Sequence, residues 1–485
     1  PLTTTGLPRP RPAPMAEDWT PGTGTRASIL GTRFLGAGLG LYHLRPVPMV
    51  GRRHERDHLW RLLAQVHEDG RPRAVVVAGP SAVGKSRPEE WLTERAQELG
   101  AAEVLTATHG PVASPGDGVV AAIQRHLRAE GLGEDERLER LYRQLSDHGR
   151  EPQVNLIDLR LLGGGGHHAS EEERQRATAR YLTSSARVRP LILWLDDAQW
   201  GFESLGLAGR LLDEERANVL VVLTVRHEAL AERPLEAERL EQLASRDKGG
   251  ELGLPPLPGD EHAELVDGLV GLEGAEHEEV LERTRGNPLF AVQLVGDWVE
   301  RGVLEVGEVG FRRVAGAQAP LPDGIHTVWS QRVERLLQRL DAPDAGRLAL
   351  EVAATLGPVL DQEEWEAVCQ HRGVQAPEGL GRALERARLA WPRFEQGGTK
   401  WGFAHGMLRE SITRGAEEAG RLRAHHRACA EVLERAGQGG AHHERVAAHW
   451  VAGGQLERAL APLLEAAEYH SKRGDFLRAL AMDDR

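Results

Sequence analysis

The segment GPSAVGKS at positions 79–86 constrains this chain more than any other feature. Its two glycines let the backbone wrap closely, so that successive N–H groups point at a bound anion. Lys85 supplies a compact ammonium that reaches phosphate oxygens from a tight turn, and Ser86 offers a hydroxyl to Mg²⁺. Lys85 is also the only lysine in the first 247 residues, although the chain has 60 basic residues. We therefore predict a phosphate-binding loop formed by Gly79, Pro80, Ser81, Ala82, Val83, Gly84, Lys85 and Ser86.

The flanking sequence supports this prediction. Residues 73–78 (RAVVVA) are apolar and β-branched, as in a buried parallel strand. Apolar residues then recur at helical spacing from Trp91 to Leu99, and Gly100 follows as a C-terminal cap. Bound phosphates would lie on the helix N-terminus. Pro88 falls in the first turn, where its missing N–H breaks no hydrogen bond, so we expect a small local perturbation and no loss of the helix. The alternative is a glycine-rich turn that merely precedes a helix.

Composition narrows the functional classes. At 485 residues the chain has room for three or four domains. Its net charge of −13 disfavours nonspecific attraction to nucleic acid or to an anionic membrane. Two cysteines form no disulfide framework, so a reducing cytoplasm is expected. No apolar run approaches the roughly 18 residues of a membrane span, and nothing resembles a signal peptide. The chain begins with Pro1 and stops inside a helical pattern, which suggests a fragment.

Alternating patterns predict the domain order. Residues 1–46 are rich in Pro, Gly and Thr, as in a linker or the remnant of an upstream domain. Within residues 47–250, short apolar runs alternate with longer amphipathic segments, which predicts an α/β P-loop NTPase core with a doubly wound parallel sheet. The predicted strands are residues 73–78, 102–106, 191–195 and 219–225. The sequence GGGGHH at 163–168 is expected to be a surface loop.

Helical periodicity takes over beyond the predicted core. Residues 251–316 are typical of a helical subdomain, and residues 317–415 of a winged-helix-like domain whose wing is a two-stranded stretch at 391–403. Residues 416–485 are helical throughout. There GQLERAL at 454–460 is echoed by GDFLRAL further on, at 474–480, which favours the start of tetratricopeptide-like α-hairpin repeats.

Two carboxylates end the apolar run LILWLDDAQW at 191–200. At the carboxyl edge of a strand beside the phosphate loop, a carboxylate can accept a hydrogen bond from Mg²⁺-bound water. We assign Asp196, with Ser86, to the metal, and Asp197 to polarising the attacking water. The alternative is that the two aspartates merely end a strand and cap a helix.

The next apolar run, VLVVLTVRHEAL at 219–230, contains Thr224 and Arg226 near its end. An arginine at this edge can reach the γ-phosphate and stabilise the charge that develops as phosphate leaves. Arg226 is therefore a second candidate catalytic residue. The alternative is a surface arginine in a salt bridge.

Six segments together resemble a known family. In chain order they are VGRRHERDHL, GPSAVGKSR, LDDAQW, LTVR, RTRGNPLFAVQLV and FAHGMLRE. They resemble the AAA-type ATPase module of the STAND class of signal-transduction NTPases, which is similar to the Orc1-like ATPase domain. The resemblance covers roughly residues 47–485. In bacteria such modules often follow a protein kinase or cyclase domain and precede tetratricopeptide repeats. Pro88, where a leucine would be expected, is the main departure inside a motif.

The resemblance implies further site residues. The segment with Val50, Gly51 and Arg52 would lie over the adenine of bound ATP. Pro288 would pack on the base, with a simple helix start as the alternative. His405 would contact the β-phosphate of ADP and hold a resting state closed, with a satisfied core histidine as the alternative.

The combined expectation is a cytoplasmic, ATP-dependent signalling switch that uses ATP/ADP and Mg²⁺ and hydrolyses ATP slowly. Protein partners would bind the helical repeats, an upstream kinase or other effector domain would be linked, and a nucleotide-dependent homo-oligomer is possible. No kinase signature is present. One alternative is a DNA-binding Orc1-like ATPase, but residues 321–400 hold ten basic and twelve acidic residues, so nucleic acid is disfavoured. Another is a scaffold that holds nucleotide without turnover.

Overall fold

The structure is a computed structural model, and it describes most of the chain. The described residues are 39, 47, 49–111, 117–129, 132, 134–146, 162, 170–307, 310–314, 324–395, 398–436 and 440–472. The predicted linker at 1–46 therefore lies outside them, apart from position 39. So do the GGGGHH loop and the second copy of the repeat, at 474–480.

The first region of the fold is built on a five-stranded parallel sheet with the order β2-β3-β4-β1-β5. The strands are β1 (Arg73–Gly79), β2 (Glu103–Thr108), β3 (Leu191–Asp196), β4 (Val219–Arg226) and β5 (Glu251–Gly253). All four predicted strands are confirmed. Strand β5 was not predicted, because three residues with a single buried side chain carry no periodic signal.

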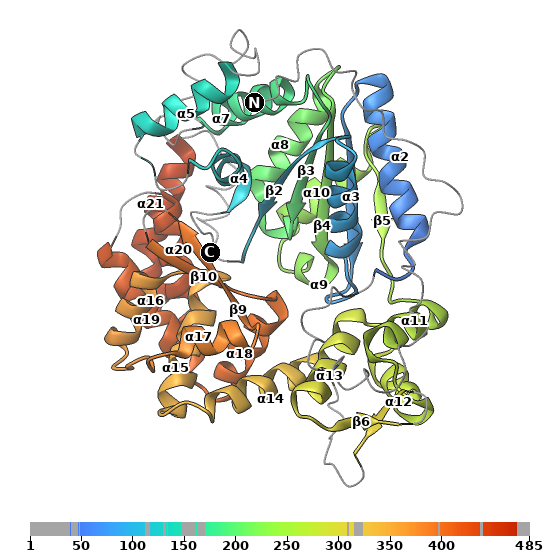
Figure 1. The fold of residues 1–485 in the computed structure, drawn as a ribbon. Helices are drawn as coiled ribbons and strands as arrows, with labels where there is room; N and C mark the ends of the chain where they lie inside the picture. Colours follow the sequence, from blue (N-terminus) through green and yellow to red (C-terminus); the bar gives the residue numbers. More distant parts are fainter. Residues whose placement is uncertain are drawn as a thin grey trace.

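Helices cover both faces of this sheet, which gives three layers (Figure 1). On one face, Val75 and Val77 of β1 pack with α2 (Arg53–Asp69) and α3 (Ser86–Glu98). Val76 and Ala78 point to the other face. The helices there are α4 (Gly118–His126), α7 (Glu171–Ser185), α8 (Phe202–Asp213) and α10 (Pro234–Ala244), with α5 (Glu134–Ser146) and α9 (His227–Leu230) beyond them. This arrangement is the predicted P-loop NTPase fold.

Helix α3 is retained despite Pro88, as expected. The helix runs without a break from Ser86 to Glu98 with Pro88 in its first turn. Gly100 follows with φ 65°, the left-handed geometry expected of a cap. One expectation was wrong, since Leu99 is 48% exposed and does not belong to the apolar face.

The C-terminal region is mainly helical. It begins with α11 (Gly259–Val270), α12 (Gly274–Thr284) and α13 (Pro288–Glu300), followed by the antiparallel strands β6 (Leu304–Val306) and β7 (Phe311–Arg313). It continues with α14 (Ile325–Leu337), α15 (Pro343–Leu356), β8 (Val359–Asp361), α16 (Gln362–His371) and α17 (Leu380–Arg386). Strands β9 (Ala390–Glu395) and β10 (Gly398–Phe403) then precede α18 (Gly406–Glu418), α19 (Leu422–Ala436), α20 (Gly440–Ala452) and α21 (Leu456–Lys472).

Two strand assignments in this region differ from the sequence expectation. The β6–β7 hairpin falls in a segment expected to be helical, and its strands are only three residues each. The predicted two-stranded stretch is present as β9 and β10, but β8 adds a third strand to it. The division into domains and the winged-helix and tetratricopeptide assignments stay predictions.

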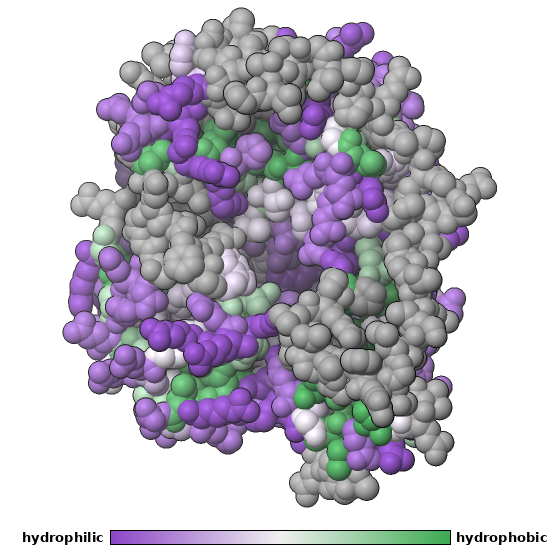
Figure 2. Space-filling view, viewed as in Figure 1, coloured by the Kyte–Doolittle hydropathy of each residue, from purple (hydrophilic) through white to green (hydrophobic). Residues whose placement is uncertain are grey.

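A surface indentation lies between the two regions. In the space-filling view, the surface is indented between the α/β region and the C-terminal region, and the side chains visible there are mostly hydrophilic (Figure 2). One apolar core extends from Val50 and Leu257 through helices α11–α19. Among the described residues, no helix is long and apolar enough to cross a membrane.

Candidate functional site

The segment between β1 and α3 has the geometry of a phosphate loop. A Cβ added to Gly79 would lie 2.5 Å from the carbonyl oxygen of Leu254, so only glycine fits there. Gly84 has φ 83°, and a Cβ on it would lie 3.3 Å from Cγ of Pro288. Both predicted glycines are therefore required by close backbone approach or by a left-handed backbone. The Ser81 amide donates to the Glu228 carboxylate at 3.0 Å, so at least one loop N–H already faces an anion.

Lys85 lies inside the loop that it closes. Its side chain is buried, and Nζ donates to the carbonyl oxygens of Gly79 at 3.0 Å and Pro80 at 2.8 Å. Burial lowers the pKa of Lys85, while the nearby Asp197 carboxylate raises it and Arg226 lowers it further. The ammonium is thus held at the mouth of the loop by two main-chain oxygens, which a phosphate can replace.

Asp196 ends strand β3 beside this loop. Thr224 on β4 donates its hydroxyl to Oδ1 of Asp196 at 2.5 Å. Burial, and then the charge of Asp197, raise the pKa of Asp196 to about 6, against the opposing effect of the Thr224 bond. The sequence places Thr224 at the end of a strand but does not reveal this bond. The bond becomes evident only from the strand pairing, because β3 and β4 are neighbours in the sheet.

His109 is a polar residue that the sequence did not single out. It follows β2, and its Nδ1 lies 2.9 Å from the main-chain oxygen of Asp196. Its Nε2 lies 2.8 Å from Oγ of Ser204 on α8. A Cβ on Gly201 would come within 2.6 Å of the ring. His109 therefore fixes the backbone that carries the two aspartates, and its position directly after a strand was the available signal.

Asp197 and Arg226 face each other across the carboxyl edge of the sheet. Nε and Nη2 of Arg226 each donate to Asp197 at 2.9 Å, one to each carboxylate oxygen. Gln199 also donates to Oδ1 of Asp197, at 3.0 Å. The backbone of Asp197 has φ 52°, and its N–H donates to Thr224 at 3.0 Å. The carboxylate predicted to act on water is thus held by a charge-assisted pair in this structure.

Arg226 also reaches the C-terminal region. Its Nη1 donates to the Glu410 carboxylate on α18. The sequence alternative for Arg226, a salt bridge, is therefore present, although the side chain is only 16% exposed. Burial alone would lower the pKa of Arg226, but Asp197 and Glu410 raise it well above its ordinary value. Glu410 is the last residue of FAHGMLRE and was not named as a site residue.

A cavity of about 390 Å³ adjoins the phosphate loop. Six predicted site residues line it: Val50, Arg52, Val83, Gly84, Pro288 and His405. Apolar side chains from both regions complete much of the wall, namely Val47, Met49, Leu257, Leu265, Leu289 and Val292. The cavity is large enough for a planar aromatic base, which favours apolar walls on its faces. Segments far apart in sequence therefore meet where the resemblance implies an adenine.

Arg52 contacts the loop more closely than the sequence suggested. Its Nη2 donates to the main-chain oxygens of Val83 at 3.3 Å and Pro255 at 2.5 Å, and its Nη1 donates to Glu55 at 3.2 Å. The guanidinium is thus engaged by protein groups and braces the phosphate loop. Gly51 precedes it with φ 61°, and a Cβ there would overlap the Glu261 carboxylate at 2.0 Å.

Pro288 and His405 both stand at helix starts that face this cavity. Pro288 is the first residue of α13, whose Asn287 cap accepts a hydrogen bond from Phe290 N–H at 2.9 Å. Helix start and pocket wall are therefore compatible roles. His405 caps α18 and is exposed, so it is not a buried core histidine. Desolvation by the surrounding protein, and then the charge of Arg332, lower the pKa of its imidazole.

Glu89 is a further titratable group that the sequence did not single out. It lies one turn into α3, is completely buried, and neither carboxyl oxygen has a hydrogen-bond partner among the described residues. Burial, and then the charge of Asp196, raise its pKa well above the ordinary value. This shift favours the neutral form of Glu89, which would add no negative charge where phosphates would bind.

The fold and this loop define a P-loop NTPase. Residues 48–223 match a family described as AAA ATPase domain. A search of curated proteins gave no match.

Solved structures were compared as well. A STAND ATPase with a tetratricopeptide repeat sensor from Pyrococcus horikoshii aligns over 90% of this chain at 13% identity, with a TM-score of 0.42. The chain spans 58% of that protein's length. A Walker-type ATPase of Pyrococcus abyssi aligns over 77% of this chain and 99% of its own, at 17% identity and a TM-score of 0.34. The Aeropyrum pernix ORC1 protein in complex with DNA aligns over 78% and 95%, at 15% identity and a TM-score of 0.35.

Proposed function

We propose that this protein is an ATP-dependent molecular switch that binds ATP with Mg²⁺ between its α/β and C-terminal regions and hydrolyses it slowly. One observation carries the proposal. Arg226, at the carboxyl end of β4, pairs at once with Asp197 of the α/β region and with Glu410 of α18. It does so beside a cavity lined from both regions. A group that competes for Arg226 would change how the two regions are joined.

The phosphate loop supplies the binding contacts. Its amides and Lys85 would bind the β- and γ-phosphates, and the base would occupy the cavity between Val50 and Pro288. No cluster of three His, Cys, Asp or Glu side chains suited to a metal occurs in the described part of the chain. Mg²⁺ needs none, because it takes phosphate oxygens and water beside one or two protein ligands. Ser86 and Asp196 would hold it, and the ion would neutralise phosphate charge.

Hydrolysis would depend on releasing Asp197. In this structure its carboxylate is bound by Arg226 and Gln199. A γ-phosphate draws the guanidinium by a charge-assisted bond of similar strength. Once Arg226 turns to the phosphate, Asp197 can accept a proton from water, and Glu410 loses its partner. The same exchange therefore frees Asp197 to act as the base and removes the ion pair that holds α18 to the α/β region. Contacts that differ between the two nucleotide states in this way are what a two-state switch requires.

His405 would act on the opposite state. Its imidazole lines the cavity from the start of α18, so a ring N–H can donate to the β-phosphate of ADP. That contact would hold α18 against the nucleotide after the γ-phosphate has left. Slow reset follows if ADP leaves only when this contact opens.

The C-terminal helices would bind protein partners. The protein would be cytoplasmic and linked to a kinase or another effector domain. It could also form a nucleotide-dependent homo-oligomer. Helix α21 presents Leu456, Leu460 and Leu464 at four-residue spacing, each more than half exposed. Such a stripe suits a further helix or a partner helix. The rival functions are a DNA-binding Orc1-like ATPase and a nucleotide-bound scaffold without turnover.

The test is to separate the two partners of Arg226. Glu410→Gln should raise ATP turnover about threefold to tenfold, because it weakens a half-buried ion pair that restrains Arg226. Asp197→Asn should keep ATP affinity but lower turnover by roughly 100-fold, as expected when a general base is lost. Single-turnover hydrolysis and calorimetry measure both quantities.

Glu417→Gln is the matched control for the first variant, since Glu417 lies on the same helix and is exposed. It should behave like the wild type. A wild type without measurable turnover would favour the scaffold. Equal turnover in the wild type, Glu410→Gln and Asp197→Asn would refute the roles given to both carboxylates. Tight duplex DNA binding that weakens steeply with salt would favour the Orc1-like alternative.

A further inference from the structure

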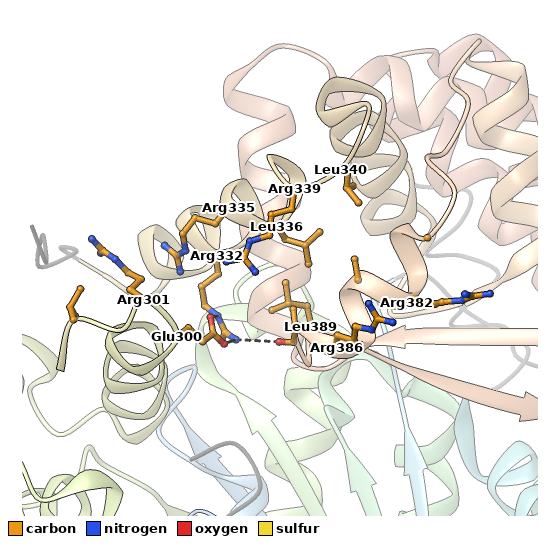
Figure 3. A pocket seen from close by; sticks show the side chains of 14 residues that line it. Glu300, Arg301, Arg332, Arg335, Leu336, Arg339, Leu340, Arg382, Arg386 and Leu389 are labelled. Atoms are coloured by element: carbon orange, nitrogen blue, oxygen red, sulfur yellow. Dashed lines mark hydrogen bonds and ion pairs between the residues drawn. The ribbon is translucent and has the colours of Figure 1, made fainter. Parts of the chain in front are cut away.

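A second cavity, of about 930 Å³, lies in the C-terminal region. It is enclosed by the end of α13, by α14 with the turn that follows it, and by α17 (Figure 3). It shares no lining residue with the cavity beside the phosphate loop. One acidic residue, Glu300, lines it, whereas its basic residues are Arg301, Arg332, Arg335, Arg339, Arg382 and Arg386.

Three of these six arginines contact carboxylates of the protein, and two carboxylates serve all three. Arg332 is paired with Glu300, and both Arg335 and Arg301 contact the Asp297 carboxylate. The pairs of Arg332 and Arg335 brace α13 against α14, whereas Arg301 pairs within the end of α13. Their positions are fixed by the fold, so they form the structural wall of the cavity.

The other three arginines have no carboxylate partner among the described residues. Arg339, Arg382 and Arg386 are exposed, and none forms an ion pair with any residue that the structure describes. Arg339 follows α14, and Arg382 and Arg386 belong to α17; in Figure 3 the side chain of Arg382 points away from the other two. Like charges gathered in one hollow repel each other and focus a positive potential there. A bound anion would relieve that repulsion.

The charge is concentrated here and not spread over the region. Residues 321–400 contain ten basic and twelve acidic residues, yet five of those ten basic residues line this one cavity. The acidic Glu378 and Glu385 flank the arginines of α17 and are exposed. A long polyanion such as duplex DNA would meet these carboxylates outside the hollow, whereas a small anion inside it would not.

Size and lining narrow the ligand further. A volume of about 930 Å³ lies within the range of small-molecule sites. Its apolar wall is made by Val303, Leu336, Leu340, Ala383 and Leu389. A planar guanidinium group can bind two phosphate oxygens at once, so Arg339 and Arg386 can together hold two phosphates, and Arg382 adds positive charge at the rim. The apolar wall suits the organic part of the same molecule.

We propose that this arginine-lined cavity is a second ligand site for a small organic molecule bearing at least two phosphates. The site is separate from the phosphate loop and does not depend on nucleotide hydrolysis. Arg332 connects the two places, since its Nη1 donates to Gln293 at 2.5 Å and Gln293 lines the cavity beside the loop.

The experiment uses the full chain with inorganic tripolyphosphate as the probe, titrated by calorimetry in saturating ADP and Mg²⁺. A fluorescent ADP analogue, followed in parallel, reports any displacement from the phosphate loop. The wild type should bind one tripolyphosphate while ADP stays bound. Arg382→Gln/Arg386→Gln should weaken this binding at least about tenfold, and Arg339→Gln should weaken it too, because each removes a charge-assisted contact.

Arg423→Gln/Arg435→Gln removes the same charge from exposed positions on α19 and is the matched control. Its affinity for tripolyphosphate should remain that of the wild type. No binding to the wild type, or an equal loss in the control pair, would overturn the proposal. A third outcome would also overturn it: Arg382→Gln/Arg386→Gln loses duplex DNA binding but keeps tripolyphosphate binding. The arginines would then bind nucleic acid and not a small phosphate ligand.

Discussion

In the α/β region the phosphate loop, Asp196 and Arg226 stand at the carboxyl ends of strands, whereas in the C-terminal region Pro288 and His405 stand at the starts of helices α13 and α18. Asp196 and Arg226 are carried by β3 and β4, which the sheet holds in fixed register. The two helix starts are placed by packing between separate segments. The strand edge therefore fixes the α/β half of the site, whereas the C-terminal half depends on how separate helices pack, and in the proposed switch this half moves.

This difference predicts which contacts contribute most to nucleotide affinity and which contacts regulate the protein. Contacts from the strand edge and the phosphate loop are present whatever the C-terminal region does, so they should dominate nucleotide affinity. Contacts from α18, such as those of Glu410 and His405, exist only when the two regions are together. They should affect the rates of hydrolysis and ADP release, and the separation of the two regions, more than the affinity for nucleotide.

The largest expected effect tests the rigid half. Lys85→Ala should weaken ATP binding by roughly 100-fold, about 3 kcal/mol, because a charged contact to the phosphates is lost. Lys248→Ala is a matched control, since Lys248 also donates to two main-chain oxygens, those of Leu212 and Glu214, but far from the loop. Calorimetry with ATP and Mg²⁺ decides the matter. Equal ATP affinity in Lys85→Ala and the wild type would refute the role of Lys85.

A smaller effect is expected on the stability of the same edge. Because the pKa of Asp196 is raised to about 6, its carboxylate destabilises the folded state as pH rises from about 4 through 6. Asp196→Asn removes that charge, so the nucleotide-free variant should be about 2 kcal/mol more stable at pH 7.5. The gain should shrink toward pH 4. Melting temperatures across this pH range measure it, and ATP binding should lose its Mg²⁺ dependence.

Asp247→Asn is the control, because Asp247 is exposed on the surface of the same region. It should leave both stability and Mg²⁺ dependence unchanged. A stability gain for Asp196→Asn that stayed constant from pH 4 to pH 7.5 would show that the carboxylate charge is not its cause.

The same contrast explains what could be predicted from sequence. Strands β1, β3 and β4 are continuous apolar runs buried on both faces, and their polar ends fall at one edge by topology alone. The phosphate loop, Asp196, Asp197 and Arg226 follow from that pattern. Strand β5 and the β6–β7 hairpin are too short to show a period.

Side-chain pairing could not be predicted in the same way. Arg226 and Glu410 are 184 residues apart, and nothing local to either reveals the other. The Thr224 bond to Asp196 and the burial of Glu89 likewise depend on neighbouring elements. Pro288 and His405 came from resemblance to a family, because a proline or a histidine at a helix start is common in any fold.

The smallest expected effect tests the C-terminal half of the site. His405 lines the cavity from the start of α18, and its lowered pKa keeps the imidazole neutral at pH 7, so it offers one N–H to a β-phosphate. His405→Ala should speed ADP release about fivefold, roughly 1 kcal/mol, the loss of one hydrogen bond. It should also raise protease sensitivity in the linker that precedes α14, near Leu321, which lies outside the described residues. Duplex DNA binding should be unchanged.

The pH dependence sharpens this last test. As pH falls through the lowered pKa of His405, the wild-type imidazole gains a positive charge beside the phosphate, so ADP release should slow. In His405→Ala that acid dependence should disappear. His54→Ala, at an exposed position on α2, is the control and should retain it. If His405→Ala kept the wild-type ADP off-rate at both pH 7.5 and pH 5.5, α18 would not touch the nucleotide. The C-terminal half of the site would then be only a wall of the cavity, and the restraint on the switch would rest on Arg226 and Glu410 alone.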